Sequence, residues 1–174
     1  LRDFYRRRQN GDAHAPAYLP DLIAQAISLT RPRWKDQTQA NGVTIDVPAG
    51  GSVTVDELTY EDPSTQTFRV ALLPADAVAP AVDPALGLEI VYGAAPMETE
   101  FCPAAKVHVP NSLGWAAGAK AELWIHGLEV GQDWAPYAGW AKVSDATVSA
   151  DGSEVVTDDG GGIPLLSTFG LKLK

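Results

Sequence analysis

The stretch that decides the fold is residues 43–58, which read VTIDVPAGGSVTVDEL. Apolar residues alternate with polar ones before and after the run Pro48-Ala49-Gly50-Gly51. A period of two residues is typical of a strand that buries one face, and a Pro/Gly cluster between two such runs is typical of a turn. This stretch therefore predicts two β-strands joined by a turn.

The same period continues to the end of the chain. Alternating apolar residues occur at 68–72, 88–92, 107–109, 123–125, 148–156 and 171–173. Residues 150–153 (ADGS) predict a hairpin turn, because Asp-Gly accepts positive φ angles. Lys172 and Lys174 alternate with leucines, which predicts a closing edge strand protected by lysines. The short, turn-punctuated intervals favour a mainly β fold, an antiparallel β-sandwich.

Residues 1–40 differ from the rest of the chain in charge. They carry seven basic and four acidic residues, net +3, whereas residues 41–174 carry six basic and 18 acidic residues, net −12. A basic leader beside an acidic body suggests that the leader docks on that body or on an acidic neighbour. The alternative is a solvated N-terminus, because chain termini are often mobile. We interpret residues 41–174 as the acidic β-sandwich domain.

One helix is predicted within this leader. Its apolar stripe follows the i, i+3, i+4, i+7, i+8 spacing of one helical face and consists of Leu19, Leu22, Ile23, Ala26 and Ile27. Pro32 disfavours helical geometry at the residue before it. The helix is therefore expected at about residues 20–29, with its stripe buried on a neighbouring surface.

Composition excludes several classes of protein. The 174 residues are 45% hydrophobic, yet no apolar run approaches the roughly 18 residues of a membrane span. A net charge of −9 argues against nucleic acid as a partner. The single cysteine allows neither an intrachain disulfide nor a thiolate metal cluster.

Two segments do not follow the strand pattern. Residues 74–84 (PADAVAPAVDP) predict an extended connection across the sandwich. Residues 134–140 (WAPYAGW) are aromatic but interrupted by Pro136 and Gly139, so they predict either an irregular strand or a loop that carries a binding site.

No residue pattern indicates catalysis, a cofactor or a metal. We interpret Cys102 as a small buried residue rather than as a nucleophile paired with His108. His14, His108 and His126 lack ligand spacing, and strand pairing could bring at most two of them together. The acidic runs 158–162 and 56–57 lack the spacing of a calcium loop and are interpreted as solvated turns.

Aromatic residues are concentrated within 26 positions, at Trp115, Trp124, Trp134, Tyr137 and Trp140. If Leu123 and Ile125 belong to the core, Trp124 faces outward together with Glu122 and His126. Exposed aromatic rings beside polar groups bind proteins or sugars. Three interpretations remain open here: rings covered by the leader or by residues 134–140, a surface for a protein partner, and a carbohydrate platform.

Two stretches, residues 43–58 and 101–164, resemble a known family. Phe101-Cys102-Pro103 leads into a strand that ends at Pro110-Asn111, and residues 113–118 form a glycine-containing turn. Residues 140–152 and the closing run 160–164 (GGGIP) continue the pattern. Together they resemble the secreted ZU5-like, immunoglobulin-like β-sandwich modules of large bacterial surface proteins of the myxobacterial type. The His-Phe-Ser tripeptide of self-cleaving relatives is absent from the sequence, so autoproteolysis is not expected.

The resemblance implies a non-catalytic structural or interaction module at the cell surface, secreted or in the periplasm. Its partners would be other protein subunits or neighbouring domains of a precursor. The alternative hypothesis is a carbohydrate-binding module that holds polysaccharide with the five clustered aromatic residues. A third hypothesis is an accessory fragment of a larger enzyme.

Overall fold

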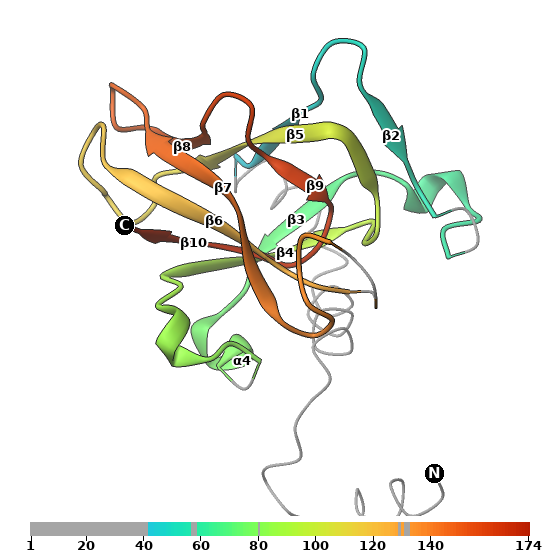
Figure 1. Cartoon of the computed structure of the whole chain (residues 1–174), viewed down its shortest axis with the longest axis horizontal. Helices are drawn as coiled ribbons and strands as arrows, with labels where there is room; N and C mark the ends of the chain where they lie inside the picture. The colour runs from blue at the N-terminus through green and yellow to red at the C-terminus, as the bar shows by residue number, and fades with distance from the viewer. Residues whose placement is uncertain (1–41, 57–58, 80, 129, 131–132) are drawn as a thin grey trace, which may run out of the picture.

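The computed structural model describes residues 42–56, 59–79, 81–128, 130 and 133–174 (Figure 1). The predicted leader, residues 1–40, and its helix at 20–29 lie outside the described residues. Ten strands are described: β1 (Thr44–Asp46), β2 (Ser52–Thr54), β3 (Arg69–Leu72), β4 (Ile90–Ala95), β5 (Glu100–Pro110), β6 (Lys120–His126), β7 (Trp140–Val148), β8 (Glu154–Thr157), β9 (Ile163–Leu165) and β10 (Phe169–Leu173). Three short helical segments accompany them: η3 (Pro63–Thr65), α4 (Ala75–Val78) and η4 (Pro84–Leu86).

Antiparallel pairing joins the strands into one curled sheet, which confirms the predicted mainly β, antiparallel fold. The order is β1-β5-β8-β7-β6-β10-β4-β3, and β2 and β9 pair with the first part of β5. The last part of β5 pairs with β1 and β8. This long, bent strand therefore pairs with four others, two along its first part and two along its last part (Figure 1).

The concave side of the sheet encloses the main core. Leu123 and Ile125 of β6 are fully buried, as expected, and they pack with Phe169 and Leu171 of β10. The ring of Tyr92 stacks on Phe169 with 5.3 Å between ring centres. Each large apolar side chain buried in this way stabilises the fold by about 1.5–3 kcal/mol.

The hairpin that joins β7 to β8 forms where the sequence predicts it. Val148 pairs with Val155 across the turn, and Gly152 has a φ of +74°. The Asp151 carboxylate accepts hydrogen bonds from the Ser149 hydroxyl at 2.6 Å and from the Ser153 backbone at 3.0 Å. These hydrogen bonds lower the pKa of Asp151 to about 2.

The prediction that the last strand closes an edge is wrong. Strand β10 lies inside the sheet, where it pairs with β6 on one side and β4 on the other. The alternation of leucine and lysine reports which face of a strand is buried, but it does not report the neighbours of that strand. Lys172 accordingly lies on the convex face of the sheet rather than at its rim.

The prediction of an extended connection at residues 74–84 is also wrong. This segment contains the short helix α4, which begins directly after Pro74. A proline is tolerated at the start of a helix because the first N–H groups have no helical partner there. Val78 of α4 packs with Leu73 and Val91 in a second, smaller core on the convex face of the sheet. No helix in the described part of the chain is long and apolar enough to cross a membrane.

Candidate functional site

The five clustered aromatic residues do not form one platform. Trp115 lies in the β5–β6 loop, Trp124 lies in β6, and Trp134 and Tyr137 lie in the β6–β7 loop. Trp140 begins β7. The surroundings of the five rings differ.

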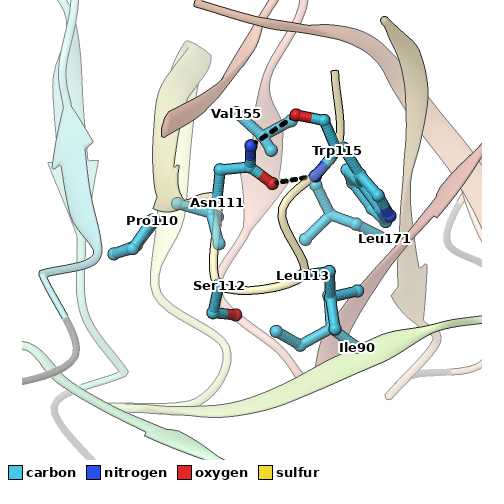
Figure 2. Close-up of a pocket in the computed structure, with 9 residues that line it drawn as sticks. Ile90, Pro110, Asn111, Ser112, Leu113, Trp115, Val155 and Leu171 are labelled. Carbon is cyan, nitrogen blue, oxygen red and sulfur yellow. Dashed lines mark hydrogen bonds between the residues drawn. The ribbon is translucent and has the colours of Figure 1, made fainter. Parts of the chain in front are cut away.

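Trp115 is held by the side chain of Asn111. The Asn111 amide nitrogen donates to the Trp115 carbonyl at 2.8 Å, and its amide oxygen accepts from the Trp115 backbone N–H at 2.9 Å (Figure 2). The indole N–H donates to Glu89 at 3.3 Å. The pocket beside it holds about 10 Å³, which is room for about one water molecule. Trp115 is therefore a structural residue of this loop.

Trp124 is half-buried under polar groups on the convex face. Its indole N–H donates to Glu122 at 3.0 Å, and the Lys172 ammonium lies 4.7 Å from the centre of its ring. Burial opposes ionisation of Glu122, but hydrogen bonds from Trp124 and Lys142 hold the pKa of that carboxyl below its ordinary value. The ring of Trp124 is therefore covered by the ammonium of Lys172, a residue of the neighbouring strand β10.

A β-bulge assembles the charges around Trp124. Between β6 and β7 the register passes from Leu123 opposite Ser144 to Trp124 opposite Lys142, so Val143 is the extra residue. The bulge puts Lys142 and Asp145, three positions apart, on the same face, where their side chains lie 2.6 Å apart. Hydrogen bonds from Lys142 and Lys174 lower the pKa of Asp145 to about 2.

The half-buried Trp140 packs against the buried His126, which corrects the prediction that His126 faces outward. His126 is only 6% exposed, and its ring meets that of Trp140 edge to face at 5.5 Å. The Trp140 indole donates to the Ala81 carbonyl at 3.3 Å and packs into the second core. Burial lowers the pKa of His126, against the opposing effect of a backbone hydrogen bond with Ala138.

Trp134 is the one ring of the five that lines a cleft of ligand size. The cleft is open to solvent and has a volume of about 390 Å³, within the range of about 300–1,000 Å³ for small-molecule sites. It is lined by Trp134 and Asp133, Lys142 and Val143 of β7, Ala104 of β5, the glycine run 160–162 and Pro164. Tyr137 is 52% exposed in the same loop but lies outside this lining.

Sequence reasoning identified Trp134 but missed its neighbours in the cleft. The position of Lys142 in the cleft could not be predicted, because no sequence pattern indicates the β-bulge beside it. The glycine run 160–162 was interpreted as part of an acidic turn and of the closing run 160–164, and not as part of a binding site. Three consecutive glycines between strands were the available signal, because such a run permits close backbone approach.

Two interpretations of single residues are also corrected. Cys102 is exposed rather than buried, since its position in β5 faces away from the core while Phe101 faces inward. His108 and His126 are not neighbours, because β8 and β7 separate β5 from β6. His108 instead lies between two carboxylates, 3.2 Å from Asp46 and 3.1 Å from Glu154.

The acidic turn at residues 158–162 has lysine partners. Asp159 lies 2.8 Å from Lys106, and Asp158 lies 3.7 Å from Lys120. The Lys106 ammonium lowers the pKa of Asp159. Among the described residues no group of three or more His, Cys, Asp or Glu side chains is arranged to hold a metal ion.

Comparison with known proteins gives no further assignment: no family model, no curated protein and no solved structure matches this chain.

Proposed function

We propose that this chain is a non-catalytic interaction module of an extracytoplasmic assembly, and that it joins a second copy of itself through strand β2. The observation that carries the proposal is the exposure of β2. All three of its residues, Ser52–Thr54, are exposed, and within the described residues this strand pairs with β5 alone. In Figure 1 it lies on the right-hand side of the molecule.

The chemistry of this edge favours pairing with another strand. A strand at the edge of a sheet presents unpaired backbone N–H and C=O groups, which natural proteins often protect with lysine or proline. Strand β2 reads Ser-Val-Thr and carries neither. Val53 is 50% exposed, and Val47, in the connection between β1 and β2, is 37% exposed.

Such an edge is suited to self-association about a twofold axis. Two copies of β2 can pair antiparallel, so that the same surface of each copy meets the other. Val53 and Val47 would then be covered by their counterparts. Three residues bury little area, and interfaces of small area are weak or transient. We therefore expect a reversible dimer rather than a permanent one.

The proposed location outside the cytoplasm is supported by the resemblance of residues 43–58 and 101–164 to secreted surface modules. The test is fractionation of the source cells with an antibody against the folded domain. Protein in the surface, periplasmic or medium fraction supports the proposal, whereas protein confined to the cytosol overturns it.

The dimer is tested by sedimentation velocity across a range of protein concentrations. The variant Val53→Lys should shift the equilibrium to monomer, because it puts a charge at the centre of the pairing edge. Leu113→Lys is the matched control, since Leu113 is 47% exposed and lies in the β5–β6 loop. A chain that stays monomeric at every concentration, or one that responds equally to both variants, contradicts the proposal.

A further inference from the structure

The cleft beside Trp134 has a rigid wall. A Cβ atom at Gly161 would lie 2.2 Å from the Ser144 hydroxyl oxygen, and one at Gly162 would lie 2.2 Å from the Ala105 carbonyl oxygen. The glycine run therefore packs its backbone directly against β7 and β5. The Gly161 N–H also donates to the Asp158 carbonyl at 3.0 Å. Such a wall is formed before any ligand arrives, which lowers the entropic cost of binding.

Trp134 supplies an aromatic face that is fixed in place. One part of its half-buried side chain packs against the main core, while the residue also lines the cleft. A ring held in this way loses little freedom when a ligand stacks on it. Indole rings combine an apolar face with a polar N–H, which suits ligands that have both kinds of surface.

The charge of Lys142, which lines the cleft, is balanced by carboxylates outside the lining. The Lys142 ammonium lies 2.6 Å from Asp145 and 3.4 Å from Glu122, so its charge is already compensated within the fold. An ammonium has three N–H donors, and two carboxylate partners leave one for a ligand. Asp133, exposed at the cleft, contributes an acceptor. The net charge of −9 further disfavours anionic ligands.

From these features we propose that the cleft binds a neutral saccharide. One ring of the sugar would stack on Trp134, and its hydroxyl groups would accept from Lys142 and donate to Asp133. The glycine run would form the opposite wall, where the absence of side chains leaves room for a bulky ring. This site is separate from strand β2, so it does not depend on the proposed dimer.

The decisive variant adds a side chain at the wall without disturbing the fold. Gly160 has a φ of +76°, and a Cβ atom there would meet nothing within 4 Å. Asparagine tolerates such a φ angle better than most residues, so Gly160→Asn adds a side chain to a lining residue of the cleft at low cost to stability. Gly152→Asn is the matched control, because Gly152 has a φ of +74°, equally open surroundings and a place in the β7–β8 turn.

The experiment screens the whole chain against an array of neutral oligosaccharides (cello-, chito-, malto-, xylo- and manno-series) together with sulfated and uronic acid glycans. Calorimetry then gives the affinity of the hits. We expect at least one neutral series to bind, and Gly160→Asn to weaken its binding by about tenfold or more, which corresponds to about 1.4 kcal/mol. Gly152→Asn and Val53→Lys should leave the affinity unchanged.

Trp134→Phe provides an independent readout. It keeps an aromatic ring in the cleft, but it should abolish the change in tryptophan fluorescence that accompanies binding. The proposal is overturned if no glycan of the array binds, or if only charged glycans bind. It is also overturned if Gly160→Asn leaves the affinity unchanged.

Discussion

The ammonium of Lys172 lies 4.7 Å from the centre of the Trp124 ring and 3.6 Å from the Glu122 carboxylate. It also donates a hydrogen bond to the Leu86 carbonyl at 3.0 Å. Residues from β6, β10 and η4 therefore meet at one lysine. This side chain connects the convex face of the sheet to the segment that follows α4.

Replacing Lys172 by methionine should destabilise the fold, because the side chain keeps its length but loses these three contacts. A cation–π contact and a hydrogen bond of a charged donor together suggest a loss of about 1–3 kcal/mol in the free energy of unfolding. The measurement is urea denaturation followed by circular dichroism. Lys106→Met is the control: its partner Asp159 is fully exposed, and such pairs contribute about 0–1 kcal/mol. Equal losses in the two variants would contradict this account.

The sequence predicted the strands well because alternation is a local property. Leu123, Ile125 and Val148 all lie in strands and are buried, as their spacing indicates. Strand order is not local. Strand β10 became an interior strand through pairing with β4, which lies about 80 positions earlier in the chain, and no property of Leu171 or Lys172 encodes that partner.

The candidate site was predictable only in part for the same reason. Trp134 stands out in the sequence as a tryptophan in a proline-interrupted loop. Its cleft also needs Ala104 of β5, Lys142 of β7 and the glycine run 160–162, which come from three separate segments. The bulge at Val143 decides on which face Lys142 lies, and it arises from pairing with β6 rather than from the sequence of β7.

Asp145 should make stability depend on pH in the acidic range. Its pKa of about 2 in the folded chain lies below the value of about 3.9 expected when unfolded. The ionised form therefore stabilises the fold fully above about pH 4, and this contribution is lost as the pH falls toward 2. Asp145→Asn should lower the melting temperature at pH 7, and its difference from the original chain should shrink between about pH 4 and pH 2.

Asp76→Asn provides the comparison for that pH series, since Asp76 is an exposed residue of α4. Its melting temperature should follow that of the original chain at each pH. If the melting temperatures of Asp145→Asn and the original chain differ as much at pH 2 as at pH 7, the ion pairs with Lys142 and Lys174 are not the cause.

Gly162 should tolerate no side chain. Its φ is +145°, and a Cβ atom would lie 2.2 Å from the backbone oxygen of Ala105. Gly162→Ala combines backbone strain with overpacking, and overpacking alone costs about 1–3 kcal/mol. The Cβ atom of Gly160→Ala would contact nothing within 4 Å, so this variant loses stability only through the strain of its positive φ, about 1–2 kcal/mol. Chemical denaturation should therefore rank Gly162→Ala as clearly the less stable; the opposite ranking would refute the close packing of this turn on β5.

The side chain of Asn111 should be essential for the end of the sheet where the β5–β6 and β7–β8 connections meet. It makes two hydrogen bonds to the Trp115 backbone and a third, at 2.9 Å, to the Gly152 carbonyl. Asn111→Ala leaves these backbone groups without their partner, and one unsatisfied group costs about 1–3 kcal/mol. Urea denaturation should show a loss in this range, and limited proteolysis should cut residues 111–119 faster. Leu113→Ala, in the same loop with a half-exposed side chain, should change neither quantity much. If the two variants behave alike, the loop is held by its apolar contacts, and the hydrogen bonds of Asn111 contribute little.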